Sequence, residues 1–245
     1  MLRIQGPRPL RVPLRVIRGT LPAIAAMALL ASCTTPAAAP SATPVAAATT
    51  AAPATPAPTP TSPIPKIPDP VAVEVPVKGA ALLVLDITSV ICPPRPACVA
   101  SVPKIAALVK KASDAKVPVI YSRTPTAGST YVAEVAPQAG EAEVSGRADK
   151  FFGTNLEQLL KDKAVETAVV VGAAANGAVL YTTFGLNLRG ITAVVAQDGI
   201  SGDPEFTETL TRWQLLNQPG LANANNTPLA KGLVTLSTTD RITFK

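Results

Sequence analysis

The chain of 245 residues contains no histidine and only three cysteines, and aromatic residues make up 4% of it. Without histidine the chain cannot build a serine-histidine catalytic triad or a histidine metal site. We therefore expect no metal and no cofactor. Any catalytic group must come from carboxylates, lysines, hydroxyls or the few cysteines.

A strong excess of positive charge is also missing once the N-terminal segment is set aside. The whole chain has 22 Lys and Arg against 16 Asp and Glu, but five of the arginines precede Cys33. The other 17 basic residues almost balance the 16 acidic ones, which removes the main support for a nucleic-acid partner. We expect no nucleic-acid binding.

Residues 1–32 have the pattern of an export signal. Arginines precede the apolar stretch from Leu21 to Leu30, which is too short to remain as a spanning helix. The next residues, Leu30-Ala31-Ser32-Cys33, resemble a bacterial lipoprotein cleavage box. They predict lipidation of Cys33 and anchoring to a membrane of the cell envelope, on its periplasmic or outer surface. A plain secretory signal with an incidental cysteine is the alternative.

Residues 33–76 are rich in alanine, proline and threonine, and 12 of the 26 prolines lie between Thr34 and Pro76. Such a composition offers too little apolar surface to form a core, so we predict a disordered tether. A cell-wall spacer or a glycosylated stalk is the alternative to a passive linker. Residues 77–245 are enough for one domain with a full core.

Within this domain, strand-like and helix-like patterns alternate. Alternation predicts a three-layer α/β/α sandwich around a doubly wound, mostly parallel sheet of Rossmann type, with its site beyond the carboxyl ends of the strands. The segment from Thr124 to Lys150 reads as a long loop, either a lid or dimer contact or a solvated excursion. The expected strands are Ala80–Asp86, Val117–Ser122, Glu166–Gly172, Ile191–Gln197 and about Leu233–Leu236, and the expected helices begin at Ser101, Thr154, Gly177 and near Glu205.

Several segments resemble the isochorismatase-like, or cysteine hydrolase, superfamily. Its members carry Gly-x-x-x-x-x-Cys-x-x-x-Thr at a strand-to-helix turn, and counting from Gly172 places Ala178 at the cysteine and Thr182 at the threonine. The family's lysine lies six residues before a Phe-x-Gly-Thr-Asp-Leu-Glu segment, where this chain has Ser145. The similar segments are Ala81-Leu-Leu-Val-Leu-Asp86, Val117-Pro-Val-Ile-Tyr-Ser-Arg123 and Phe151-Phe-Gly-Thr-Asn-Leu-Glu157.

The resemblance implies catalytic roles for an Asp, a Lys and a Cys, of which Asp86 stands in place. Ala178 excludes thiolate attack from its position, although the backbone of Asn176, Gly177 and Ala178 could still hold an oxyanion or a ligand carboxylate. Lys150 either replaces the missing cation or is a surface lysine beside the hydrophobic anchor Phe151 and Phe152. With position 145 empty of lysine, we expect Ala178→Cys alone to restore little activity.

Cys92 and Cys98 remain after Cys33 is lipidated. In an exported protein, an even pair predicts a disulfide, here clamping the loop after the first strand. A free reactive thiol near the site is the alternative.

These observations predict an envelope lipoprotein with an isochorismatase-like hydrolase domain that is degenerate as a cysteine amidase and acts in small-molecule binding or interaction. One alternative is an active hydrolase that uses Asp86 as general acid or base on a small carboxylate, vinyl-ether or ester-like substrate. A purely structural envelope protein is another. The expected partners are a small-molecule ligand and the membrane, with a homo-oligomer left open.

Overall fold

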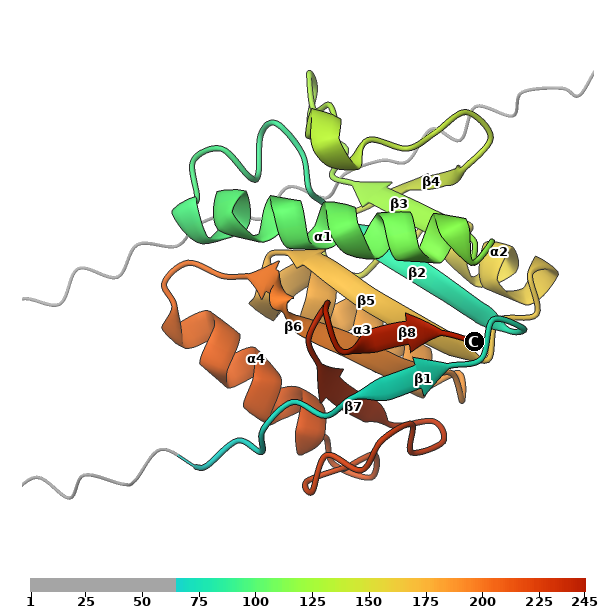
Figure 1. Cartoon of the computed structure of the whole chain (residues 1–245). Coiled ribbons are helices and arrows are strands. Elements are labelled where there is room, and N and C mark those ends of the chain that lie inside the picture. The colour runs from blue at the N-terminus through green and yellow to red at the C-terminus, as the bar shows by residue number, and fades with distance from the viewer. Residues whose placement is uncertain (1–64) are drawn as a thin grey trace, which may run out of the picture. The chain divides into compact units, whose positions relative to one another are not determined.

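The computed structural model describes residues 65–245, and Figure 1 shows their arrangement. The predicted export signal, Cys33 and the part of the predicted tether up to residue 64 lie outside the described residues. The strands are β1 (Val73–Val75), β2 (Ala80–Leu85), β3 (Val119–Arg123), β4 (Ala142–Ser145), β5 (Thr167–Ala173), β6 (Thr192–Ser201), β7 (Val234–Ser237) and β8 (Ile242–Phe244). The α-helices are α1 (Pro96–Asp114), α2 (Leu156–Asp162), α3 (Leu180–Asn187) and α4 (Phe206–Leu216).

Six parallel strands form the central sheet, in the order β4-β3-β2-β5-β6-β7. The chain winds outward from β2 through β3 to β4 and then returns to β5 on the other side of β2. The strand order therefore reverses between β2 and β5. In a doubly wound sheet, ligand sites lie at this switch point, beyond the carboxyl ends of the strands.

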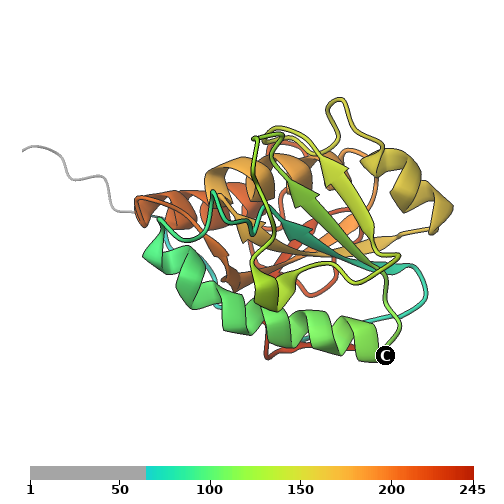
Figure 2. The same cartoon turned by 90° about the horizontal axis from the view of Figure 1, so that it is seen from above.

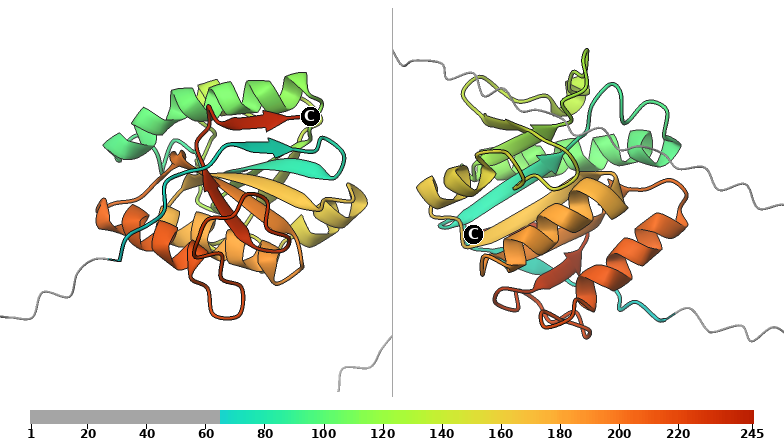
Figure 3. Two further views of the ribbon diagram at one scale, coloured as in Figure 1. Left: turned by 60° about the horizontal axis from the view of Figure 1, so that its bottom comes forward. Right: turned by 180° about the vertical axis from the view of Figure 1, so that it is seen from behind.

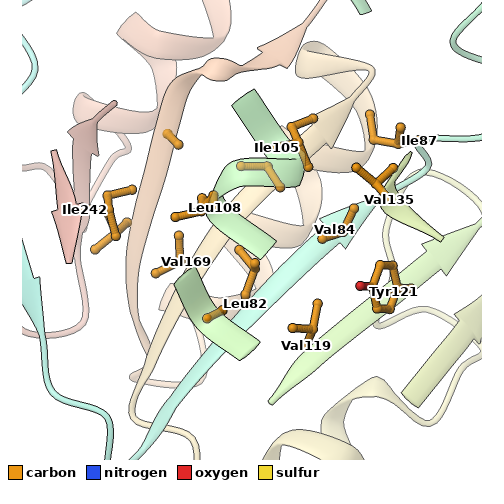
Figure 4. Packing of buried hydrophobic residues seen from close by; sticks show 14 of the residues in the cluster. Leu82, Val84, Ile87, Ile105, Leu108, Val119, Tyr121, Val135, Val169 and Ile242 are labelled. Atoms are coloured by element: carbon orange, nitrogen blue, oxygen red, sulfur yellow. The ribbon is translucent and has the colours of Figure 1, made fainter. Parts of the chain in front are cut away.

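Helices cover both faces of the sheet. Alternate residues of each strand point to opposite faces, so the apolar side chains on each face need a layer to pack against. Leu82 and Val84 pack with Ile105 and Leu108 of α1, in the core shown in Figure 4. Leu83 and Val170 point to the opposite face and pack in a second cluster with side chains of α2, α3 and α4, the helices that Figure 3 shows on that side of the sheet. Figure 2 shows α1 on one side of the sheet and the other helices on the opposite side. The predicted three-layer α/β/α architecture is thus confirmed.

Some boundaries differ from those the sequence predicts. The helix expected at Ser101 begins at Pro96, because proline needs no N–H partner in a first turn and Ser101 lies inside the helix, where its hydroxyl donates to the Cys98 carbonyl. The strand β1 lies within the segment assigned to the tether, and it pairs in parallel with β8 at the other end of the chain. The folded domain therefore starts before residue 77.

The segment from Thr124 to Lys150 is ordered rather than a solvated excursion. It contributes the edge strand β4, a short 3-10 turn at Ala133–Val135, and a backbone bridge between Tyr131 and Thr88. Val135 and Val144 are buried. The sequence does not reveal β4, because this strand is only four residues long and has only one fully buried side chain.

Candidate functional site

Asp86 follows directly after β2, at the carboxyl edge of the central sheet. Its φ of 55° places it in the left-handed region, which aspartate tolerates better than most residues, and the chain turns there out of the sheet. The Asp86 N–H donates to the Ser122 carbonyl of the neighbouring strand, 3.0 Å away. The residue as a whole is 3% exposed, so its carboxyl group lies inside the protein.

Lys150 supplies the partner of this buried carboxyl group. Its ammonium Nζ lies 2.7 Å from Asp86 Oδ2, and Lys150 has no exposed surface. The same ammonium donates to the Gly146 carbonyl at 2.8 Å, and the Ser122 hydroxyl donates to Asp86 Oδ1 at 2.8 Å. Each charged group therefore has a second polar partner, as buried ion pairs require.

Burial shifts the pKa of each group in the direction that favours its neutral form. Loss of water raises the pKa of the Asp86 carboxyl, and Lys150 and Ser122 oppose this by lowering it. Loss of water likewise lowers the pKa of the Lys150 ammonium, which the charge of Asp86 opposes. A carboxyl group whose pKa is raised is suited to hold a proton and to donate it.

The backbone of Lys150 is fixed from two directions. Its N–H donates to the Thr182 hydroxyl of α3 at 3.3 Å, and its carbonyl accepts the Thr154 hydroxyl. The next residue, Phe151, packs on α3 where Gly185 leaves room: a Cβ at position 185 would lie 2.5 Å from the ring. Phe151 is therefore the anchor predicted for this segment, whereas Phe152 is 78% exposed and is not part of the core.

Ala178 lies at the carboxyl end of β5, the strand beside β2. After Ala173 the chain forms a single π-helical turn, Ala175–Val179, that leads into α3. Gly172 is required here because its φ is 142° and a Cβ would lie 2.1 Å from the Leu85 carbonyl oxygen. Ala178 is buried, so the position that the sequence resemblance aligns with the cysteine carries only a methyl group.

The backbone predicted to hold an oxyanion is partly occupied. The Gly177 N–H donates to the Ala174 carbonyl at 3.0 Å, which removes it as a free donor in this conformation. Asn176 is exposed and Gly177 is half-buried. Of the three residues proposed to bind a ligand, Asn176 is thus the one that faces solvent most openly.

Two expectations for the cation must be corrected. Lys150 is not a surface lysine, because it is fully buried against Asp86. Ser145, where counting from the family's motif places the lysine, ends β4 and is exposed, so the charge beside Asp86 comes from five residues further along the chain. The reason for expecting Ala178→Cys alone to restore little activity is thereby removed.

Sequence reasoning missed Ser122, Gly146 and the contact of Thr182 with Lys150. A signal for Ser122 was present: it is a polar residue near the end of a buried strand, and it pairs in register with Leu85, next to Asp86. No pattern marks Gly146, because it contributes only its carbonyl oxygen.

A disulfide clamps the loop that follows Asp86. Cys92 and Cys98 are joined across six residues, and Cys98 lies in the first turn of α1. Tyr131 packs over the same loop, and its ring meets that of Tyr121 edge to face at 5.8 Å. Burial raises the pKa of both phenols, and the nearby carboxylates Glu141 for Tyr121 and Glu143 for Tyr131 add to this rise.

Within residues 65–245, no group of three or more His, Cys, Asp or Glu side chains is arranged to hold a metal ion. In the same part of the chain, no helix has the length and apolar character needed to cross a membrane.

The three-layer α/β/α fold, with Asp86 and Lys150 paired at the carboxyl edge of its sheet, is that of a hydrolase-type domain. The Isochorismatase domain matches residues 80–218, and the chain belongs to this family. Comparison with curated proteins gives no match.

Solved structures show the same fold at low sequence identity. An isochorismatase family protein from Burkholderia thailandensis is 19% identical, with a TM-score of 0.58 over 70% of this chain and 96% of that one. N-carbamoylsarcosine amidase from Thermoplasma acidophilum is 20% identical, with a TM-score of 0.53 over 66% and 96%. A nicotinamidase from Staphylococcus aureus is 18% identical, with a TM-score of 0.55 over 59% and 98%.

Proposed function

We propose that this chain is a lipid-anchored protein of the cell envelope whose isochorismatase domain binds a small molecule and does not act as a cysteine amidase. The observation that carries the proposal is the combination of a buried charge pair with the lack of a nucleophilic side chain at position 178. Asp86 and Lys150 are bonded to each other at 2.7 Å, while the buried residue at the nucleophile position is Ala178. An amide carbonyl brought to this site would meet a methyl group.

The hydroxyls near the site do not replace the thiol. Thr182 accepts the Lys150 N–H, and the Ser122 hydroxyl donates to Asp86 Oδ1. A serine or threonine is a weak nucleophile unless a neighbouring base takes its proton. Asp86 already binds Lys150, and the chain has no histidine, so neither hydroxyl has a free base of the usual kind.

One observation favours a second candidate, an active hydrolase that uses Asp86 as the acid. Burial raises the pKa of Asp86, which is the property needed to protonate the oxygen of a vinyl ether or ester-like substrate. Such chemistry needs no thiolate. It does need Asp86 to reach the substrate, and Asp86 is 3% exposed in the described conformation.

Binding and turnover can be separated with small probes. We expect benzamide, whose N–H groups can donate to the Asp86 carboxylate, to bind the wild-type protein in a calorimetric titration. Asp86→Asn should weaken this binding, while Glu157→Gln, which changes an exposed ion pair on α2, should leave it unchanged. Nicotinamide and p-nitrophenyl acetate should not be hydrolysed above background. Ester turnover that disappears in Asp86→Asn would establish the second candidate, and neither binding nor turnover would favour a purely structural protein.

The envelope location rests on the sequence from Leu30 to Cys33 and is tested separately. Cells expressing the wild type and Cys33→Ala are separated into membrane and soluble fractions. We expect the wild type in the membrane fraction and the variant in the soluble one. Release of both proteins to the same extent would refute lipid anchoring without affecting the proposal for the domain.

A further inference from the structure

Arg123 ends β3 at the carboxyl edge of the sheet, between the groups that hold the buried ion pair. Its chain neighbour Ser122 donates to Asp86 Oδ1 at 2.8 Å. Its own backbone carbonyl accepts the Gly146 N–H at 3.1 Å, and the Gly146 carbonyl accepts the Lys150 ammonium at 2.8 Å. The backbone of Arg123 is therefore fixed beside the candidate site from both directions.

The guanidinium of Arg123 has no acceptor among residues 65–245. Arg123 is half-buried, yet it takes part in no ion pair and no side-chain hydrogen bond in that part of the chain. Glu143 lies on the same face of the neighbouring strand, because it pairs in register with Tyr121, but it is exposed and forms no ion pair with Arg123. An arginine offers five N–H donors in a planar fork that matches a carboxylate, so this guanidinium is free to bind one from a ligand.

The charge of Arg123 acts at the same place as that of Asp86. Tyr121 and Arg123 alternate onto one face of β3, and the Tyr121 ring meets that of Tyr131 at 5.8 Å. Burial is the main cause of the raised pKa of Tyr131, and in addition the positive charge of Arg123 lowers this pKa while the negative charge of Asp86 raises it. One phenol thus lies within the electrostatic reach of both groups.

The balance of charge at this edge of the sheet favours an anion. Asp86 and Lys150 offset each other at 2.7 Å, which leaves Arg123 as a positive charge without a bonded partner. We propose that Arg123 is a specificity-determining residue of the candidate site, where it binds a carboxylate of the ligand. The ligand is then a small amide that also carries an acid group, which rests on the binding at Asp86 proposed above.

Two pairs of probes isolate the contribution of the carboxylate. The meta and para isomers of carbamoylbenzoate carry a carboxylate where the corresponding methylbenzamides carry a methyl group, so both members of a pair present the same amide to Asp86. The full chain in detergent is titrated by calorimetry. We expect at least one carbamoylbenzoate to bind the wild type about tenfold more tightly than its methyl partner, through a charge-assisted bond to Arg123.

Variants of Arg123 assign this gain to its guanidinium. Arg123→Met should abolish the gain and retain the binding of methylbenzamide, which also shows that the variant is folded. Arg123→Lys keeps the charge without the planar fork and should retain part of the gain. Arg212→Met is the matched control, because it removes another half-buried arginine, on α4, and should leave the gain unchanged.

Binding of methylbenzamide by the wild type without any gain from the carboxylate would overturn this inference and leave the proposed function standing. A gain that survives Arg123→Met, or that is lost equally in Arg212→Met, would also overturn it. Loss of both kinds of probe in Arg123→Met and in Arg123→Lys would show that Arg123 maintains the site and does not recognise an acid group. If no probe of either kind binds the wild type, the inference and the proposed function both fail.

Discussion

The ammonium of Lys150 lies 2.7 Å from Asp86 Oδ2 in a region where Lys150 has no contact with solvent. Two charges taken out of water together depend on each other, because each pays a desolvation penalty that only the other offsets. This relationship makes the pair a structural element of the domain as well as the electrostatic centre of its candidate site.

We expect Lys150→Met to lower the free energy of unfolding by about 3–5 kcal/mol, because it leaves the Asp86 charge buried without its partner. Asp86→Leu should cost a similar amount. The double variant should be more stable than either single variant, since both charges are then gone. Urea denaturation of the three proteins measures this coupling.

The matched control is Lys161→Met, which breaks the exposed pair with Glu157 and should cost less than about 1 kcal/mol. If Lys150→Met were as mild as this control, the pair would contribute no more than a surface ion pair does.

Alkaline stability should depend on Tyr121 and Tyr131. Burial raises the pKa of both phenols, so folding favours their protonated forms. The corresponding stability is fully present below pH 10, the ordinary value, and is lost as the pH rises above it. Relative to the wild type, Tyr121→Phe with Tyr131→Phe should gain about 1 kcal/mol per tyrosine between pH 10 and 11.

Denaturation of both proteins from pH 8 to 11 checks this prediction, with the difference below pH 9 as the internal reference. Tyr121 is a suitable position because its hydroxyl is buried without a hydrogen-bond partner among the described residues. A constant difference across the whole range would show that the folded protein does not resist ionisation of these phenols.

The disulfide between Cys92 and Cys98 should stabilise the domain by roughly 2–3 kcal/mol, because a short loop is closed in the unfolded chain. Thermal denaturation with and without dithiothreitol measures the effect. The variant with Cys92→Ala and Cys98→Ala should not respond to the reductant. Two thiols that react with an alkylating agent in protein taken from its native compartment would show that the bond does not form there.

Apart from β4, the strands of the central sheet are predicted well, and so are the helices that cover it, because each carries a strong apolar pattern. Asp86 is visible as the one polar residue that ends the all-buried run Ala80–Leu85. The short strands β1 and β8 escape prediction because three residues carry little periodicity and pair only with the opposite end of the chain.

The site is less predictable than the sheet. Lys150 reaches Asp86 through the path of the segment that carries β4, and counting residues along a motif cannot give that path. Lys150 also donates to the backbone carbonyl of Gly146, and a contact with the backbone cannot be predicted from the residue type.

The most direct test of the account is hydrolysis of nicotinamide and other small amides by the wild type, Ala178→Cys, and Ala178→Cys combined with Lys150→Met. The account predicts no turnover by the wild type and no labelling by iodoacetamide at its candidate site, because Ala178 offers no nucleophile. Ala178→Cys alone should be labelled and should gain amide turnover, since Asp86 and Lys150 are already paired at 2.7 Å, and Lys150→Met should remove that gain. Amide hydrolysis by the wild type that Asp86→Asn abolishes would contradict the account.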